Sequence, residues 1–470
     1  MAKSKLIDFV KNLSYTFVSN ILSMVISAAL VLVIPKLVGT ETYGYYQLYL
    51  FYCNYVGVLY FGWCDGIYLR LGGKYYKDLD KPLYSTQFRL LGLLEIIIYL
   101  TIFLGSFVFL NDANKHFVIG MVCISAVAMC LRWFITFILQ PTARIKECAI
   151  ITISERILFV IFAMFLMAVG YRDYRLILVS DVIAKYISLG VGIWFCSDIV
   201  FSKTVPVKFV VPEIKENISA GFKLMLSSLS SMLIIGVVRF SIENHWDIST
   251  FGKVSLTLSL SNLVMNAINA IAVVMYPVLR RTDEKSFPKI YSIMRVLLMG
   301  IIFGGIIFYY PAYRLLSLWL PQYAESLRYA AILLPMCAYE SKMSLLVNTN
   351  YKTLRLENLL MKCNMAALAL SVVLSLVSTL LLNSVTAAIL SILIVLIFRC
   401  IISELLLSKH IAIDVKKDIV IELIMTVAFI ICNWFFGLVG MFMYAVCYIA
   451  YLFIKRKDIL ESINFIKSMR

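Results

Sequence analysis

Charge is what this sequence has least of. Only 15% of its 470 residues are Asp, Glu, Lys or Arg, against about 25% in a typical soluble domain, whereas 62% are hydrophobic. A water-soluble fold could not bury so much apolar surface, so the composition indicates a polytopic membrane protein. The 43 Lys and Arg exceed the 27 Asp and Glu, but these charges lie in short loops between long apolar runs. Membrane topology explains that excess, and no nucleic-acid partner is expected.

Patterns for metal or disulfide chemistry are also missing. The chain has three His, none paired at metal-ligand spacing, and 11 Cys that lie in or beside apolar runs without CxxC spacing. We therefore expect no metal, no cofactor and no disulfide, with the Cys acting as small apolar packing residues. The basic N-terminus leads into a long apolar run, which favours a retained first span over a cleaved signal peptide.

Long apolar runs are what the sequence does contain. A bilayer-spanning helix needs roughly 20 apolar residues, and about fourteen such runs can be found. We predict an all-α polytopic membrane protein with about 14 transmembrane helices. Connections between alternate runs carry most of the Lys and Arg that lie outside the runs, which places both termini in the cytoplasm. The longest connection, about residues 198–217, is too short to fold as a soluble domain.

Part of the sequence occurs twice. "ETYGYYQLYL" (41–50) is followed 208 positions later by "STFGKVSLTL" (249–258), and "PLYSTQFR" (82–89) has a counterpart in "PKIYSIMR" (288–295). Chance similarity between Leu- and Ser-rich helices is the alternative explanation. Two halves with six spans each insert the same way up, and such halves enclose a central cavity that can open to either side. We predict an N-terminal six-helix half (1–200), a cytoplasmic linker (201–217), a C-terminal six-helix half (218–408), and two extra helices with a cytoplasmic tail (409–470).

Polar side chains follow one face of the eighth predicted span. Ser255, Ser259, Asn262, Asn266 and Asn269 recur at steps of 4, 3, 4 and 3 residues, which is helical spacing. Asn is unfavourable in lipid unless its amide finds partners or water, so this face contacts either a wet cavity or another helix. Neutral amides and hydroxyls suit a ligand rich in hydroxyl groups, such as a sugar chain. The substrate-binding candidates are Asn20, Asn54, Asp65, Arg239, Ser255, Ser259, Asn262, Asn266 and Asn269.

Charged residues inside predicted spans are functional candidates by default. Arg239 lies near the outer end of the seventh span, where it either binds substrate or snorkels to the interface. Asp65, Glu95 and Arg132 are candidates for coupling to a proton or Na⁺ gradient, and Glu95 with Arg132 alternatively forms a structural ion pair. Asp181 and its neighbour four residues on, Lys185, are expected to pair.

A group of arginines lies at the cytoplasmic ends of predicted spans. Positive-inside topology alone explains them, and the alternative is a basic vestibule that attracts a lipid pyrophosphate. These residues are Arg70, Arg89, Arg280 and Arg295.

Three segments resemble a known family of membrane proteins. They are "PKLVGTETYGYYQLYL" (35–50), "RFSIENHWDISTFGKVSLTL" (239–258) and "LWLPQYAESLRYAAILLP" (318–335). The chain resembles bacterial oligosaccharide flippases of the multidrug, oligosaccharidyl-lipid and polysaccharide exporter superfamily. The resemblance implies flipping of an undecaprenyl-diphosphate-linked oligosaccharide across the plasma membrane for capsule or O-antigen synthesis, beside a polymerase and other assembly proteins. The family commonly has Asp before the residue matching Arg239, where this chain has Val238.

Three function classes remain at this point. The leading one is a non-enzymatic flippase that works by alternating access. The second is a multidrug or cation exporter of the same superfamily, which would favour acidic and aromatic residues in its cavity. The third is a membrane-embedded polysaccharide polymerase or acyltransferase, but the sequence has neither a large external loop nor an intramembrane His.

Overall fold

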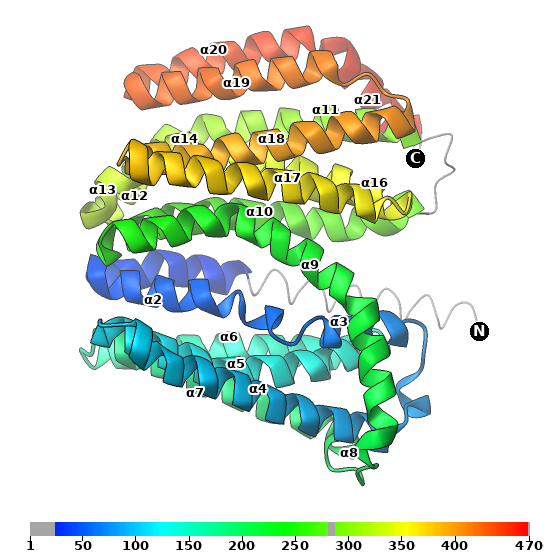
Figure 1. Ribbon diagram of the computed structural model, residues 1–470. Coiled ribbons are helices and arrows are strands. Elements are labelled where there is room, and N and C mark those ends of the chain that lie inside the picture. Colours follow the sequence, from blue (N-terminus) through cyan, green and yellow to red (C-terminus); the bar gives the residue numbers. More distant parts are fainter. Residues whose placement is uncertain (1–23, 281–286, 469–470) are drawn as a thin grey trace. The chain divides into compact units, whose positions relative to one another are not determined.

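The computed structural model describes residues 24–280 and 287–468, and within these ranges every regular element is a helix (Figure 1). The predicted all-α fold is confirmed. The count of about 14 spans is not: ten described helices are long and apolar enough to cross a membrane, or eleven when the bent pair Pro321–Leu333 and Met336–Thr353 counts as one span. A shorter apolar helix covers Met24–Leu37. The chain is a multi-pass membrane protein.

The chain divides into two compact units, Met1–Leu229 and Ser230–Arg470. This division falls inside one long helix, α9 (Val207–His245), which starts within the segment predicted as a linker. Most of the predicted linker is therefore helical, with Pro212 inside the helix.

The first unit is built around one central helix. α5 packs against α2, α3, α4 and α7, and Figure 1 shows α4 to α7 running side by side. Asp side chains accept hydrogen bonds from backbone N–H groups at the starts of α4, α5 and α7, which explains where these helices begin. The elements are α2 (Thr40–Cys53), a 3-10 turn (Val56–Val58), α3 (Trp63–Leu71), a 3-10 turn (Tyr76–Asp78), α4 (Lys81–Phe109), α5 (Ala113–Leu139), α6 (Ile145–Ala168), α7 (Tyr174–Phe195), α8 (Ser197–Val200) and the start of α9.

The second unit has α15 in its interior. This short helix packs against α10, α11 and α18, while α19 and α20 pair with each other (Figure 1). The helices are α10 (Ile248–Arg280), α11 (Phe287–Gly305), α12 (Tyr309–Trp319), α13 (Ala324–Leu327), α14 (Ala330–Leu333), α15 (Met336–Lys342), α16 (Asn348–Thr353), α17 (Glu357–Leu376), α18 (Val385–Ile411), α19 (Lys416–Phe435), α20 (Gly437–Ile454) and α21 (Arg456–Ser468). Single turns of other helix types cover Ile306–Phe308, Pro321–Tyr323, Met343–Val347 and Val377–Leu381.

The sequence repeat corresponds to repeated structure. α2 begins at Thr40 and α10 at Ile248, which is the same offset of 208 positions (248 − 40) that relates the two sequence motifs. α4 and α11 also start alike, each with a proline, Pro82 or Pro288, at its second residue. Proline is tolerated there because the first N–H groups of a helix have no intrahelical partner.

Candidate functional site

The two copies of the repeat differ where the first is interrupted. α2 ends at Cys53, whereas α10 continues to Arg280. Before α3 begins, Phe61 and Gly62 take left-handed backbone angles, with φ of 54° and 79°. Glycine adopts this conformation without steric cost, and the repeat places Ala270 at the position equivalent to Gly62. Interrupted helices at membrane depth are found in transporters where they line a substrate or ion site.

Glycines hold α3 against the first turns of α9. A Cβ atom added to Gly66 would lie 1.7 Å from the carbonyl oxygen of Asn217, and one added to Gly221 would lie 2.0 Å from that of Gly62. Any side chain at either position would collide with backbone, so the two helices approach more closely than other residues allow.

Arg70 strengthens the same contact between α3 and α9. Its guanidinium lies 2.7 Å from a carboxylate oxygen of Glu213 and 2.6 Å from one of Glu216, and it donates to Asn217 at 2.7 Å. The buried Asn217 in turn donates to Gln87 on α4 at 3.0 Å. Two carboxylates therefore balance the charge that was predicted to serve a pyrophosphate vestibule.

Glu95 and Arg132 do not pair with each other. Arg132, which is buried, lies 2.8 Å from Glu155 on α6, which is half-buried. Glu95 on α4 is fully buried, and neither of its carboxylate oxygens has a hydrogen-bond partner. The predicted Glu95–Arg132 ion pair is wrong because Glu155, which sequence reasoning did not consider, is the partner of the arginine. Asp65 on α3 is half-buried.

The predicted pair of Asp181 and Lys185 is confirmed. The two side chains form an ion pair within α7, and both are buried. Tyr49 on α2 donates to Asp181 at 2.6 Å and accepts from Lys185 at 2.9 Å. The pair therefore connects α7 to α2 and has no charge to spare for a ligand.

The residues of the predicted polar stripe on α10 differ in burial. Arg239 on α9 donates to Ser255 at 2.9 Å, and its guanidinium lies 5.2 Å from the centre of the Phe251 ring. Ser255 is buried, so it serves Arg239 as a partner and does not face open space. Ser259 is half-buried and Asn262 is exposed, so the accessible part of the stripe begins about one turn further along α10.

The other predicted binding residues have different outcomes. Asn54, at the C-terminal end of α2, is exposed. Asn20 and the side chains of Asn266 and Asn269 lie outside the described part of the chain. Their assignment to the binding site stays a prediction.

The predicted basic vestibule is not formed by Arg295. This residue is buried on α11 and forms ion pairs with Glu404, Asp418 and Glu422 at 2.6, 2.6 and 3.0 Å. The charge of Arg295 is therefore paired with three carboxylates, and its predicted role in binding pyrophosphate is wrong. Arg89 is exposed, and the side chain of Arg280 lies outside the described residues.

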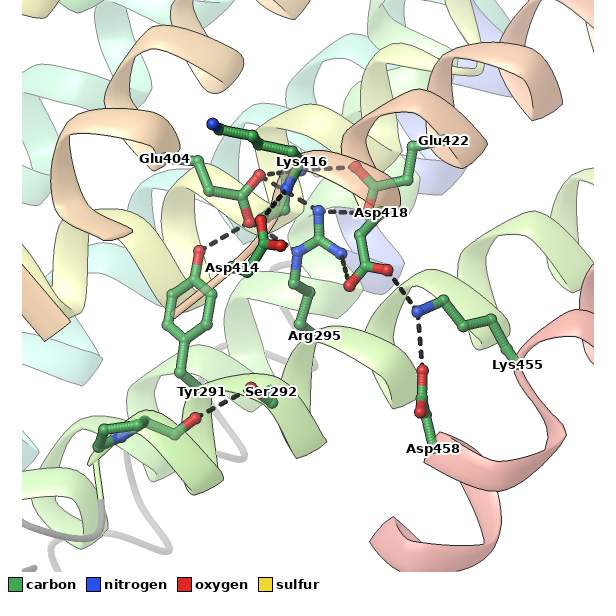
Figure 2. A network of polar contacts seen from close by, with 12 residues as sticks. Tyr291, Ser292, Arg295, Glu404, Asp414, Lys416, Asp418, Glu422, Lys455 and Asp458 are labelled. Carbon is green, nitrogen blue, oxygen red and sulfur yellow. Dashed lines mark hydrogen bonds and ion pairs between the residues drawn. The ribbon is translucent and has the colours of Figure 1, made fainter. Parts of the chain in front are cut away.

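Arg295 belongs to a charged network whose residues lie on α11, α15, α18, α19 and α21 and at the end of α20 (Figure 2). Lys342 on α15, which is fully buried, contacts Glu404 on α18 at 2.6 Å and Glu422 on α19 at 2.7 Å. Tyr291 donates to Glu404 at 2.9 Å. Lys455, directly after α20, pairs with Asp418 on α19 and with Asp458 on α21. The network ties α19 and the end of α20 to the interior of the unit.

A second polar cluster surrounds Arg399 on α18. Its guanidinium donates to Asn364 on α17 and Glu340 on α15, both at 3.0 Å, and to Ser231 on α9 at 2.9 Å. Sequence reasoning did not single out Arg399 or Lys342. Both residues could have been found from the sequence, because each is a charged residue inside an apolar run, as Glu95 is.

Comparisons with known proteins identify the fold. No protein-family model and no curated protein sequence matches the chain. Among solved structures, the lipid II flippase MurJ in an inward closed conformation matches with a TM-score of 0.67 and 12% identity, over 95% of this chain and 99% of its own. A MOP superfamily transporter from Pyrococcus furiosus matches with a TM-score of 0.55 and 13% identity, over 86% of this chain and 96% of its own.

A MATE family multidrug resistance transporter in an inward-facing conformation also matches, with a TM-score of 0.55 and 12% identity, over 84% of this chain and 98% of its own. The chain therefore has the fold of the MOP superfamily, which comprises the multidrug, oligosaccharidyl-lipid and polysaccharide exporters. This agrees with the sequence resemblance at the level of fold. The three matching proteins are described as a flippase and two transporters.

Proposed function

We propose that this protein flips an undecaprenyl-diphosphate-linked oligosaccharide from the inner to the outer leaflet of a bacterial plasma membrane, by alternating access and with both termini in the cytoplasm. The product would supply synthesis of a surface polysaccharide such as capsule or O-antigen, together with a polymerase and other assembly proteins. The observation that carries the proposal is the likeness to a lipid II flippase over 95% of the chain, at a TM-score of 0.67. The multidrug transporter matches less well, at 0.55.

The side chains on α10 supply the chemistry that such a substrate needs. Arg239 lies beside Ser255, and Asn262 is exposed seven residues further along the same helix. Seven residues of α-helix span about 10 Å, so Arg239 on α9, bound to Ser255, and Asn262 on α10 can present a cation to a pyrophosphate and an amide to the adjoining sugar. In this proposal the polyprenyl chain stays in the lipid while the polar part crosses.

A multidrug exporter is the second candidate. It is favoured by the match to the MATE family structure and by the acidic residues of the first unit, Asp65 and Glu95, because carboxylates attract cationic drugs. The amides and hydroxyls of α10 have no such preference for cations. Deletion of the gene distinguishes the two, since loss of surface glycan supports the flippase and loss of drug resistance with intact glycan supports the exporter.

Asn262→Leu tests the assignment of α10 in cells. Leucine keeps the volume but cannot hydrogen-bond to a sugar, so we expect surface glycan to fall at least about tenfold, as for loss of one or two ligand hydrogen bonds. Val264→Leu is the matched control. Val264 is exposed on the same helix, and this substitution replaces one apolar side chain by another. Equal glycan in the two variants at equal protein level would contradict the assignment.

A further inference from the structure

The exposed faces of α19 and α20 are two rows of large apolar side chains. The rows are Val420, Ile424, Val427 and Ile431 on α19, and Phe442, Val446, Ile449 and Phe453 on α20. In each row the residues follow one another at steps of 4, 3 and 4, which places them on one face of the helix. The two helices pack against each other, and both are long and apolar enough to cross a membrane. These faces therefore meet acyl chains.

Both rows end beside a pair of basic residues. Lys416 and Lys417 lie four and three residues before Val420, so they continue the row of α19. Arg456 and Lys457 open α21, within three residues of the end of α20. All four are exposed, and none of their side chains has a hydrogen-bond or ion-pair partner among the described residues. We call these four residues the basic cluster.

Lys455 brings the two pairs of the basic cluster together. Its ammonium group pairs with Asp418 in the first turn of α19 and with Asp458 in the first turn of α21 (Figure 2). Both acids are engaged in this way and do not neutralise the cluster. Two further exposed acids, Asp414 and Glu461, are outnumbered by the four cations of the cluster. The junction of α19, α20 and α21 therefore carries an excess of positive charge.

α21 also combines apolar and basic surface. It packs against α11 and exposes Leu460 and Ile463, which are three residues apart and share a face. A helix with an exposed apolar face and basic residues lies in the interface between headgroups and acyl chains. Because α20 ends at Ile454 and α21 begins at Arg456, α21 starts at that depth.

We propose that the basic cluster binds the headgroup of an anionic phospholipid whose acyl chains lie along the exposed rows of α19 and α20. One molecule then meets both the charged and the apolar surface. A soluble acidic partner would cover the charged part alone, and a zwitterionic phospholipid would bring its own ammonium group to the cations. Clusters of about four to eight Lys and Arg beside a membrane span are typical of anionic-lipid binding. The site goes beyond the proposed transport function, because it does not depend on which molecule is transported.

Native mass spectrometry of the purified full chain in detergent tests the site by counting bound lipid. The chain is titrated with phosphatidylglycerol and, separately, with phosphatidylcholine that has the same acyl chains. We expect phosphatidylglycerol to bind at least about tenfold more tightly. Each double variant, Lys416→Gln with Lys417→Gln or Arg456→Gln with Lys457→Gln, should bind it about thirtyfold more weakly, from a loss of about fivefold for each basic residue. The four side chains are exposed, so these variants should fold as the wild type does.

Two double variants in the first unit are the matched controls. Lys74→Gln with Lys77→Gln and Lys203→Gln with Lys208→Gln remove as many exposed cations, from segments predicted to lie on the same side of the membrane. Both controls should bind phosphatidylglycerol as the wild type does. An equal loss in the controls would reduce the effect to a general attraction between lipid and a basic face, and would overturn the proposal.

Three other results would also overturn it. Unchanged binding in both cluster variants would place the lipid elsewhere. Displacement of phosphatidylglycerol by an equal concentration of inorganic phosphate would show that the cluster binds a free anion and that the apolar rows contribute nothing. Displacement by an equal concentration of undecaprenyl phosphate would assign the cluster to a carrier lipid.

Discussion

Individual glycines determine how α3 is held in the first unit. Gly66 and Gly221 lie where a Cβ atom would meet backbone of the opposite helix at 1.7 and 2.0 Å. Backbone cannot move aside as a flexible side chain can, so the helices must separate to admit even one methyl group. The spacing of glycines in the sequence did not reveal this contact, because α3 and α9 are separated by more than a hundred residues.

We predict that Gly66→Ala lowers the free energy of unfolding by at least about 1–3 kcal/mol, the usual range for overpacking. Gly105→Ala is the matched control: Gly105 lies inside α4 with nothing within 4 Å of an added Cβ atom, so alanine there should be neutral or stabilise by up to about 1 kcal/mol. Thermal unfolding in detergent measures both. Similar melting temperatures for the two variants would show that the α3–α9 contact is looser than described.

Residue identity alone could not separate ligand-binding charges from structural ones. Arg295 fits a pyrophosphate vestibule by sequence, yet its partner Glu404 lies 109 positions away and occupies it. Asp181 and Lys185 were predictable because their spacing of four residues places them together on any helix. Pairings between residues on distant helices can be found only from the structure. The same is true of the difference in burial between the exposed Asn262 and the buried Ser255.

At the scale of elements, a charged network fastens the last helices to the second unit. Lys342 is fully buried between Glu404 and Glu422, so removing its charge leaves two buried acids with one cation fewer. We predict that Lys342→Met destabilises the protein by about 3–5 kcal/mol, as expected for a broken buried ion pair. Adding Glu422→Gln should recover part of this loss, because it removes one of the uncompensated charges.

The exposed Lys409 on α18 provides a control for that experiment. Lys409→Met should change stability by no more than about 0.5 kcal/mol. Melting temperatures of the three variants and the wild type give the comparison. A small effect of Lys342→Met would mean that the network does not stabilise the unit.

The short helix α8 offers a pH-dependent contact outside the spans. Asp198 accepts a hydrogen bond from Tyr76 at 2.7 Å and lies 2.9 Å from the ammonium group of Lys81. Partial burial raises the pKa of Asp198, but the bond from Tyr76 and the charge of Lys81 outweigh it and hold the pKa below its ordinary value. Since the folded pKa is depressed, the stabilisation is complete above the unfolded pKa of about 3.9 and is lost as pH falls through the folded pKa.

We therefore predict that Asp198→Asn lowers stability at pH 7 by less than about 1 kcal/mol, because the pair is partly exposed. The difference from the wild type should shrink as pH is lowered below about 4. A difference that stays constant with pH would contradict the assigned pairing.

At the scale of the whole molecule, the prediction of two similar halves was based on the sequence repeat. Matching helix starts at Thr40 and Ile248 were visible in the sequence because Thr, an aromatic residue and Gly recur together at the same offset. The interruption after α2 was not predicted. Apolar content marks a span whether or not it is continuous, and the break is seen only in the structure, where α2 ends at Cys53 and Phe61 and Gly62 take left-handed angles.

The predicted number of about 14 spans stays unconfirmed, because ten or eleven helices of the described residues are long and apolar enough to cross a membrane. Apolar runs such as the segment from Pro321 to Thr353 are long enough to cross a membrane but fold into short helices with a bend of 47°. The break between Leu333 and Met336 contains Pro335, which has no N–H to continue the helix, and a hydropathy pattern does not register this. Fold class was therefore predictable from composition, whereas the shape of individual spans was not.

The most direct test of the account is transbilayer movement of one substrate in vesicles that contain this protein alone. A fluorescent undecaprenyl-diphosphate oligosaccharide is placed in one leaflet, and its arrival in the other is read with an impermeant quencher. We predict movement well above protein-free vesicles, strongly reduced by Asn262→Leu and retained in Val264→Leu. No movement above protein-free vesicles under any ion gradient, or uptake of a cationic dye in place of the glycolipid, would contradict the account.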